Sequence, residues 1–519
     1  MEAGPELVIG LIGALGTDLK AVEELLDREL RSVGYNSTLI RLSDLLLECH
    51  KYSSHLALKH GPDDIRIEQL MNDGDDLRRT AKRGDAVVLL SLAKIKQIRS
   101  DTGSTGEPLQ RHAFILHSLK HPNEISTLRE VYGNAFVSIS VYTPKSTRRT
   151  KLAERITHSH QRYNSTTYAD RADALIERDE KAVGEDLGQN VRDTFPEADI
   201  FFDGSDAEFL HGQVRRFIEI LFRHPNRTPT VDEYGLFHAK AAAMRSSDLS
   251  RQVGAVITTE DGEIIAAGCN EVPKAGGGAF WEGQSLENNS DRRDFVLGHD
   301  ANSQMKHELL EEVFTQLKGK GWLSDRFVCF DAAELVDKAL FDPKEAALSG
   351  TRVTSIVEFG RIVHAEMSAI TEAARRGVSV KNATLYCTTF PCHMCARHVI
   401  SSGIRRVVYV EPYPKSMAKD LYSGLLDVDH DPNADRDAVK FRPFVGVSPR
   451  RYIDFFEMPV RKDKRGIATP WTPLNALPRV KQFPTYLEAE TVLVKILSIG
   501  QYEWGLLERD LLTGASNHE

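Results

Sequence analysis

The sequence comprises 519 residues, enough for two or more domains, and its 41% hydrophobic and 27% charged residues are typical of a globular protein. A formal net charge of −9 excludes an overall electrostatic attraction to a polynucleotide, and no apolar run reaches the roughly 18 residues that a membrane-spanning helix requires. Six cysteines are too few for a disulfide framework, so we expect a cytoplasmic protein with reduced thiols.

The first predicted element is an apolar strand over 7–12, which runs into a glycine-rich turn and an amphipathic helix over 20–33. A unit of strand, glycine loop and helix places backbone N–H groups where they can hold phosphate groups. In the alternative interpretation, the glycines only permit a tight turn in a structural scaffold. The candidate nucleotide-binding residues are Gly10, Gly13, Gly16, Thr17 and Asp18.

This segment resembles, in a degenerate form, the phosphate-binding loop of P-loop nucleoside and nucleotide kinases. When Gly13 is aligned with the first glycine of that motif, Asp18 stands at the second glycine and Leu19 at the lysine. The lysine that contacts the β- and γ-phosphates in that family is therefore missing. The resemblance implies a P-loop kinase-like domain that binds a nucleotide without turning it over.

Further short apolar runs over 85–90, 113–116, 135–142 and 198–204 predict buried strands, with helical stretches between them. This alternation predicts a doubly wound α/β sheet for residues 1–228. Residues 117–120 follow one of the strands, at the edge where open α/β sheets bind ligands.

The stretch 224–229 is the predicted linker to a second domain over 229–519. There, a helix over 237–247 precedes a β-hairpin, because the Asp-Gly pair at 261–262 favours a tight turn between apolar strands. A long insertion over about 276–353 follows, with its own predicted helices over 303–322 and 331–340. We expect the insertion to be an appended subdomain for assembly, allostery or nucleotide gating.

A set of metal-ligating residues stands at two predicted helix starts: His364 at the first, and Cys392 and Cys395 at the second. One imidazole and two thiolates suit zinc, and three protein ligands leave a fourth position for water. Glu366, two residues after the histidine, can reach that water and move protons without ligating the metal. The sequence therefore predicts a catalytic Zn²⁺ site.

Strands predicted over 383–389 and 405–410 alternate with these helices, which implies a parallel pair joined by a crossover. Two alternatives remain open for the metal site. The cysteines form a redox pair, or they belong to a structural zinc site for which Cys387 is the nearest further thiol.

The combination of His-x-Glu with Pro-Cys-x-x-Cys is the signature of zinc nucleobase deaminases, and the chain resembles that superfamily. The phrase over 251–257, followed by Asn270, resembles its deoxycytidylate branch. The resemblance implies a cytidine-deaminase-like α/β/α domain in which Glu366 is catalytic, Asn270 contacts the sugar, and the backbone of Ala365 meets the pyrimidine. Otherwise, an asparagine after a strand is a turn residue.

The two regions together resemble bacterial anti-phage dCTP deaminases. That resemblance implies deamination of dCTP, and often dCMP, to deoxyuridine nucleotides, which depletes dCTP during infection. It also implies a homo-oligomer, an allosteric nucleotide, and control by an inhibitory RNA or a phage-derived trigger. The alternatives are a housekeeping dCMP deaminase, a polynucleotide deaminase, and a nucleotide-sensing regulator with a residual zinc site.

Overall fold

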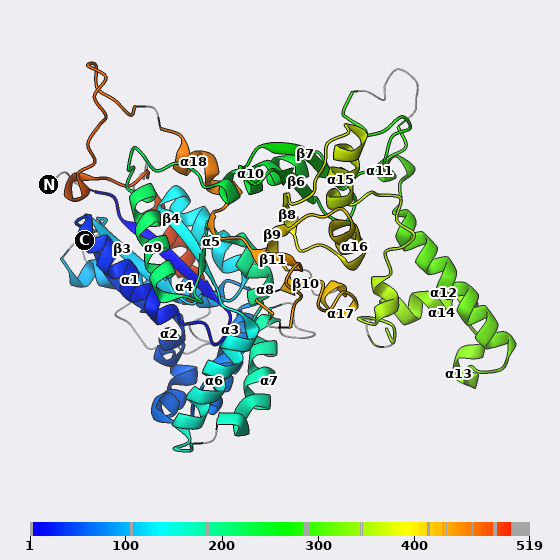
Figure 1. The fold of residues 1–519 in the computed structure, drawn as a ribbon. Helices are drawn as coiled ribbons and strands as arrows, with labels where there is room; N and C mark the ends of the chain where they lie inside the picture. The colour runs from blue at the N-terminus through cyan, green and yellow to red at the C-terminus, as the bar shows by residue number, and fades with distance from the viewer. Residues whose placement is uncertain are drawn as a thin grey trace. The chain divides into compact units, whose positions relative to one another are not determined.

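The chain forms two compact units, each built around one β-sheet (Figure 1). The computed structural model describes residues 4–103, 107–163, 165–181, 187–283, 291–342, 344, 346–412, 416–428, 430–431, 433–458, 460–480 and 485–499. The first unit contains residues 1–233 and 444–519, and the second contains 234–443. The sequence-based limits of 1–228 and 229–519 stay predictions of folding domains, and they did not anticipate the return of residues 444–519 to the first unit.

The first unit has a sheet in the order β12-β5-β4-β1-β3-β2, in which every pairing except that of β12 with β5 is parallel. The central strand is buried along its whole length, as expected of a parallel strand covered on both faces. The strands are β1 (Leu7–Gly13), β2 (Asn36–Arg41), β3 (His112–His117), β4 (Phe136–Tyr142), β5 (Ile200–Asp203) and β12 (Gly446–Val447).

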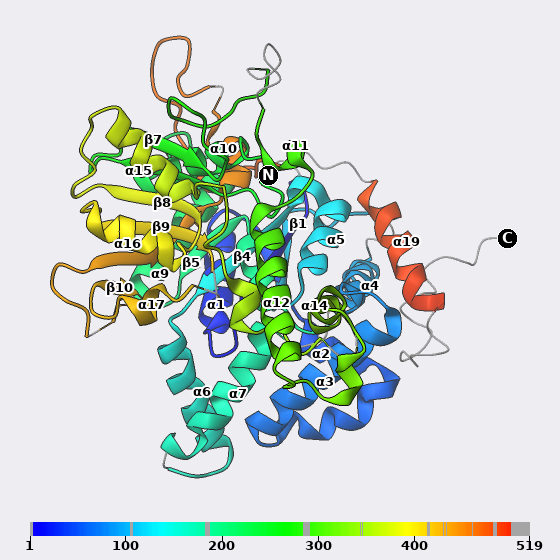
Figure 2. The same cartoon turned by 90° about the vertical axis from the view of Figure 1, so that its right-hand side faces the viewer.

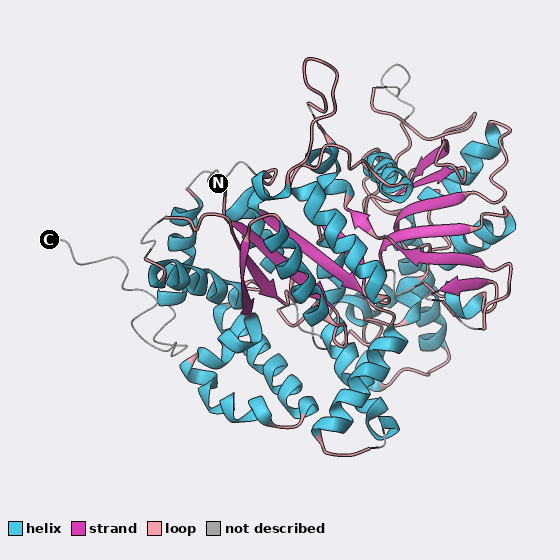
Figure 3. Cartoon of the chain, turned by 60° about the vertical axis from the view of Figure 1, so that its left-hand side comes forward, coloured by secondary structure: helices cyan, strands magenta, loops and turns pink. Residues whose placement is uncertain are grey.

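Helices lie on both sides of this sheet (Figure 3). Because the chain runs from β1 to β2 in one direction and from β3 to β5 in the other, right-handed crossovers place α1 on one face and α5 on the opposite face. The helices are α1 (Leu19–Ser32), α2 (Leu42–Glu48), α3 (Asp63–Ala81), α4 (Ala86–Asp101), α5 (Pro122–Tyr132), α6 (Lys145–Ser159), α7 (Ala169–Glu180), α8 (Val191–Thr194), α9 (Ala207–Leu221), α18 (Tyr452–Phe456) and α19 (Tyr486–Ile499). This doubly wound α/β arrangement agrees with the prediction, while the P-loop kinase-like assignment stays a prediction.

One predicted strand is wrong: residues 85–90 belong to the cap and first turns of α4. Periodicity does not separate a buried strand from a helix that is buried nearly all round. Ala86 to Ala93 are all buried in the structure, so the first half of this helix has no polar face that would have shown a helical period.

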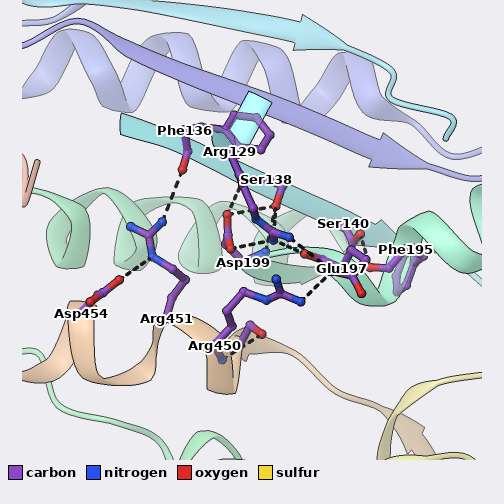
Figure 4. A network of polar contacts seen from close by, with 11 residues as sticks. Arg129, Phe136, Ser138, Ser140, Phe195, Glu197, Asp199, Arg450, Arg451 and Asp454 are labelled. Atoms are coloured by element: carbon purple, nitrogen blue, oxygen red, sulfur yellow. Dashed lines mark hydrogen bonds and ion pairs between the residues drawn. The ribbon is translucent and has the colours of Figure 1, made fainter. Parts of the chain in front are cut away.

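The chain returns to the first unit after residue 443 through β12, which pairs Gly446 with Phe201 and Val447 with Ile200. Figure 4 shows the polar contacts that follow this strand. Arg450 donates to Glu197 at 2.6 Å, and Arg451 donates to the Phe136 carbonyl at 3.4 Å. This basic stretch therefore fastens the returning segment to the edge of the first sheet.

Further along the returning segment, α19 closes a buried ionic cluster. The Arg99 guanidinium donates to the carboxylates of Glu6, at 3.1 Å, and Glu490, at 2.9 Å, and Tyr132 donates its hydroxyl to Glu490 at 2.6 Å. The two carboxylates are each 1% exposed, so the arginine between them compensates charges that water does not reach.

The second unit has a sheet in the order β10-β11-β9-β8-β6-β7. The predicted hairpin is confirmed, because β6 and β7 pair antiparallel across a turn in which Gly262 has a φ of +88°. The predicted parallel pair is confirmed as well, because β8 and β9 pair in register from Thr384–Arg406 to Thr389–Glu411. The strands are β6 (Gly254–Thr258), β7 (Ile264–Cys269), β8 (Thr384–Thr389), β9 (Arg406–Glu411), β10 (Leu426–Val428) and β11 (Val439–Pro443).

Helices cover both faces of this second sheet, and Figure 2 shows α15 and α16 beside β8 and β9. A Cβ atom at Gly268 would lie 2.4 Å from the Ala365 carbonyl oxygen of α15, and one at Gly254 would lie 2.0 Å from the Ala239 carbonyl oxygen of α10. The two glycines therefore let helices approach opposite faces closely. The helices are α10 (Val231–Ala243), α11 (Asp294–Leu297), α12 (Ala301–Gly319), α13 (Asp325–Val328), α14 (Ala332–Phe341), α15 (Ala365–Arg375), α16 (His393–Ser401) and α17 (Ala418–Leu421).

The insertion contains the helices predicted for it. Helices α12 and α14 pack against each other, and the side chains of Asp300 and Asp331 accept backbone N–H groups at their N-termini. Short 3₁₀ helices occupy His50–His60, Gly133–Ala135, Ser165–Tyr168, Phe195–Glu197, Arg352–Ser355, Pro449–Arg451 and Pro473–Asn475. None of the helices that the structure describes is long and apolar enough to cross a bilayer.

Candidate metal centre

The predicted metal ligands lie together at the N-termini of two neighbouring helices. His364 is the N-cap residue of α15, Cys392 is the N-cap residue of α16, and Cys395 lies in the first turn of α16. The Nδ1 atom of His364 lies 3.3 Å from Cys392 Sγ and 3.4 Å from Cys395 Sγ. Among the described residues, these three form a group whose potential ligand atoms all lie within 4.8 Å of one another.

The geometry of this group fits a zinc ion. With typical Zn–S and Zn–N bonds, adjacent nitrogen and sulfur ligands of a tetrahedral site lie about 3.5 Å apart, close to the separations above. Cys387, the candidate fourth ligand of a structural site, does not belong to the group. The residues therefore fit a three-ligand site and do not support the alternative of a structural site with Cys387 as a fourth ligand.

The same residues shift one another's acidity. Hydrogen bonds from Cys395 and His364 lower the pKa of Cys392. The hydrogen bond between His364 and Cys392 in turn raises the pKa of His364. The thiol that donates, Cys395, has its pKa raised. One thiol at a helix N-terminus is thus held as a thiolate, the form that ligates a metal.

Glu366 lies in the first turn of α15 and is 4% exposed. Burial, followed by the negative charge of Cys392, raises the pKa of its carboxyl above the ordinary glutamate value. A glutamate of raised pKa beside a metal-ligating group is suited to accept and return a proton near neutral pH.

A cavity of ≈ 220 Å³ opens over the metal-ligating group. Ala365, Glu366 and Asn270, which the sequence placed at the site, all line it. The insertion adds Asp294, Asp300 and Asn302 to the wall, although its helical pattern alone carried no sign that it reaches the site. The insertion is therefore part of the pocket and not only an appendage.

Asn270 is 4% exposed, and its side-chain amide is already engaged within the protein. It donates to Asp248 and to the Arg251 carbonyl, each at 2.6 Å, and accepts from the Val253 N–H at 2.6 Å. Both amide hydrogens are used, so the amide oxygen alone can still accept a bond from a ligand. Asn270 also fixes Asp248, a pocket residue that sequence reasoning missed and whose carboxyl pKa is raised by burial.

Two arginines line the same cavity, and sequence reasoning assigned a role to neither. Arg251 forms an ion pair with Glu411. Arg361 donates to Asp294 of the insertion at 2.7 Å. Arg361 stands three residues before His364, and this nearness in the chain was the available signal. Guanidinium groups at a pocket wall suit anionic substrate groups such as phosphates.

The glycine loop of the first unit lines a separate cavity of ≈ 550 Å³. Gly13, Gly16, Thr17 and Asp18 reach that cavity, and Asp18 caps α1 by accepting from the Ala21 N–H at 3.2 Å. Gly10 does not line it. It lies inside β1, where a Cβ atom would be 2.6 Å from the Leu119 side chain, so its role is close packing.

Comparison with known proteins finds a deaminase family and several named deaminases. Residues 229–411 match the sequence model of a family described as the cytidine and deoxycytidylate deaminase zinc-binding region. The chain is 33% identical over 178 residues to the deoxycytidylate deaminase of Enterobacteria phage T2. The aligned residues make up 34% of this chain and 78% of that protein. It is 48% identical over 54 residues to the deoxycytidylate deaminase of Enterobacteria phage T4, 10% of this chain and 28% of that protein.

Among solved structures, the apo dCMP deaminase of cyanophage S-TIM5 matches with 14% identity and a TM-score of 0.21, over 42% of this chain and 100% of that chain. The stretch that matches the family, 229–411, includes His364, Glu366, Cys392 and Cys395.

Proposed function

Because the chain belongs to the deoxycytidylate deaminase family, we propose that its second unit hydrolyses the cytosine of a deoxycytidine nucleotide to uracil and ammonia. The observation that carries this proposal is the buried carboxylate of Glu366 next to a His/Cys/Cys group at the wall of one cavity. A site that only stabilised the fold would gain little from burying that carboxylate, because burial of a charged group is costly.

His364, Cys392 and Cys395 are the residues that would hold a zinc ion, which when bound supplies a water of near-neutral pKa. Glu366 accepts a proton from the attacking water and delivers it to N3 of the cytosine. The same carboxyl then carries the second proton to the amino group that leaves C4 as ammonia. Its raised pKa suits it to both directions of transfer.

The pocket wall supplies the groups that orient the nucleotide. The backbone of Ala365 meets the pyrimidine ring. Asn270 meets the sugar through its amide oxygen, which retains a free lone pair, and Asp248 beside it accepts from a sugar hydroxyl. Arg251 and Arg361 exchange their carboxylate partners for substrate phosphates.

We extend the substrate from dCMP, for which the relatives are named, to dCTP. The support is the second unit's fusion to a doubly wound α/β unit with a glycine loop, the organisation that resembles bacterial anti-phage dCTP deaminases. In this proposal the enzyme depletes dCTP during infection. The first unit is a P-loop kinase-like domain that binds a regulatory nucleotide through its glycine loop. The enzyme is a cytoplasmic homo-oligomer whose activity is set by an RNA or a phage-derived partner.

The test is a substrate panel on the zinc-loaded full chain, with dCTP, dCMP, CTP and cytidine compared by chromatography of the products. We expect conversion of both deoxynucleotides, slower conversion of CTP, and none of cytidine, which lacks the phosphates that the arginines bind. Conversion of dCMP alone would replace the defence proposal with maintenance of the pyrimidine pool. A purified, zinc-loaded chain that converts none of the four would overturn the proposed activity.

A further inference from the structure

The ≈ 550 Å³ cavity of the first unit has no part in the proposed deamination site and is lined by many charged side chains. Among the described residues, seven lysines and arginines line it, and six of them pair with carboxylates, several of which lie just outside the lining. Three of the seven, Arg41, Lys151 and Arg155, come from β2 and α6. A multiply charged anion could bind here if its oxygens replaced some of these carboxylates.

The lysine that the glycine loop lacks is supplied from a distant part of the chain. Lys120 follows β3, and its Nζ atom donates to the Gly13 carbonyl at 3.0 Å, 107 residues away in sequence. It lies at the carboxyl end of a parallel strand next to β1, where loops of an open α/β sheet meet. Lys120 therefore brings to the loop the ammonium group that Leu19, at the lysine position of the motif, cannot supply.

A carboxylate of the protein accepts hydrogen bonds from both Lys120 and the glycine loop. Asp179, in the last turn of α7 and 1% exposed, accepts from Lys120 Nζ at 2.8 and 3.1 Å and from the Leu15 N–H of the loop at 2.7 Å. A lysine ammonium together with loop N–H groups is the donor set that holds a phosphoryl group in glycine loops. Asp179 is thus placed as a phosphoryl group would be.

Two further polar groups in the cavity lack a hydrogen-bond partner among the described residues. The side-chain oxygens of Gln189 and Thr17 are buried and, within the part of the chain that the structure describes, have no hydrogen-bond partner. Gln189 is 9% exposed, and both residues line the cavity. Buried polar groups are normally satisfied, so these two indicate a ligand that supplies the missing bonds.

We propose that the Asp179 carboxylate stands in the phosphoryl position of this loop, and that a nucleoside triphosphate must displace it to bind. This inference rests on the proposed nucleotide binding at the loop and adds that Asp179 controls this binding. The ligand phosphates take Lys120 and the Leu15 N–H, Thr17 and Gln189 gain partners, and the end of α7 is released. Binding in the cavity is therefore coupled to a movement of α7.

The displacement lowers the affinity for the nucleotide, because only chains with Asp179 released are competent to bind. Asp179→Asn keeps a carbonyl oxygen for the Leu15 N–H but removes the charge that holds Lys120. We expect this variant to bind a triphosphate at least about tenfold more tightly than the unaltered chain. Asp173→Asn is the matched control, since it removes a carboxylate from the same helix that pairs at the surface with Arg149.

The experiment is calorimetric titration of the full-length chain and both variants with ATP, whose adenine is not a substrate for cytosine deamination. Tighter binding by Asp179→Asn, with Asp173→Asn unchanged, supports the inference. Equal or weaker binding by a folded Asp179→Asn variant overturns it. Lys120→Met, which removes the lysine, must weaken binding in either background, or ATP binds elsewhere and the inference fails.

Hydrogen exchange on the unaltered chain tests the inference without any substitution. Saturating ATP should slow exchange in the loop at 13–20 and accelerate it at 176–180. Protection of the loop with unchanged exchange at 176–180 would refute the role of Asp179 and leave nucleotide binding at the loop intact. An absence of ATP binding in every variant would refute both the role of Asp179 and nucleotide binding at the loop.

Discussion

Gly268 offers a direct test of how the fold positions α15, the helix that carries His364 and Glu366. A Cβ atom at this position would lie 2.4 Å from both the Ala365 carbonyl oxygen and the Ala369 nitrogen. Since nonbonded heavy atoms settle at about 3.5 Å, Gly268→Ala forces β7 and α15 apart by about 1 Å. His364 and Glu366 move with that helix.

We expect the substitution to destabilise the unit by about 1–3 kcal/mol, the usual cost of overpacking, and to lower kcat by about 100-fold, because a displacement of that size disrupts catalytic alignment. The matched control is Gly254→Ala. Its Cβ would overlap the Ala239 carbonyl oxygen of α10, at 2.0 Å, on the opposite face of the sheet. This control should be destabilised at least as much while keeping most of its turnover.

The assay combines urea unfolding, zinc content and steady-state deamination for both variants. A folded Gly268→Ala protein that turns over at the wild-type rate would refute the claim that this close approach sets the position of Glu366. Equal losses of kcat in the two variants would also refute it, since the effect would then follow stability and not the face of the sheet.

Two other predictions concern the metal and the returning segment. Cys395→Ser should lose its zinc, measured by elemental analysis, while Cys329→Ser, an exposed cysteine outside the site, should keep it; stoichiometric zinc in Cys395→Ser would require a different ligand set. Arg99→Met leaves the buried carboxylates of Glu6 and Glu490 without their cation and should lower the free energy of unfolding by about 3–5 kcal/mol. A loss below about 1 kcal/mol in urea unfolding would show that this cluster does not hold α19 in place.

The sequence could indicate the candidate metal centre because the pattern that points to it is local. His364 and the two cysteines each stand at a helix start that short-range rules recognise, and the parallel pair β8 and β9 brings those starts to the same edge of the sheet. The candidate ligand set could therefore be proposed without any knowledge of long-range contacts, and Glu366 was placed beside it from its spacing; its catalytic role stays a prediction.

The remaining features depend on contacts between distant residues. β12 is two residues long and is a strand only because β5 pairs with it, so no pattern in 444–458 announced the return to the first unit. Lys120 reaches the glycine loop from 107 residues away, and a motif comparison confined to the loop found the lysine missing. The strand prediction for 85–90 failed for a third reason, since these residues lie in the half of a helix that is buried on every side and has no amphipathic period.

The central claim is that Glu366 moves the protons of deamination in the second unit. Its most direct test is the conversion of dCMP by the zinc-loaded chain and by Glu366→Gln at matched zinc content, followed as release of ammonia. We expect the variant to keep its fold and metal and to lose activity by about 10²–10⁴-fold, the usual contribution of a general acid–base group. A folded, zinc-loaded Glu366→Gln protein with turnover close to that of the unaltered chain would contradict the account.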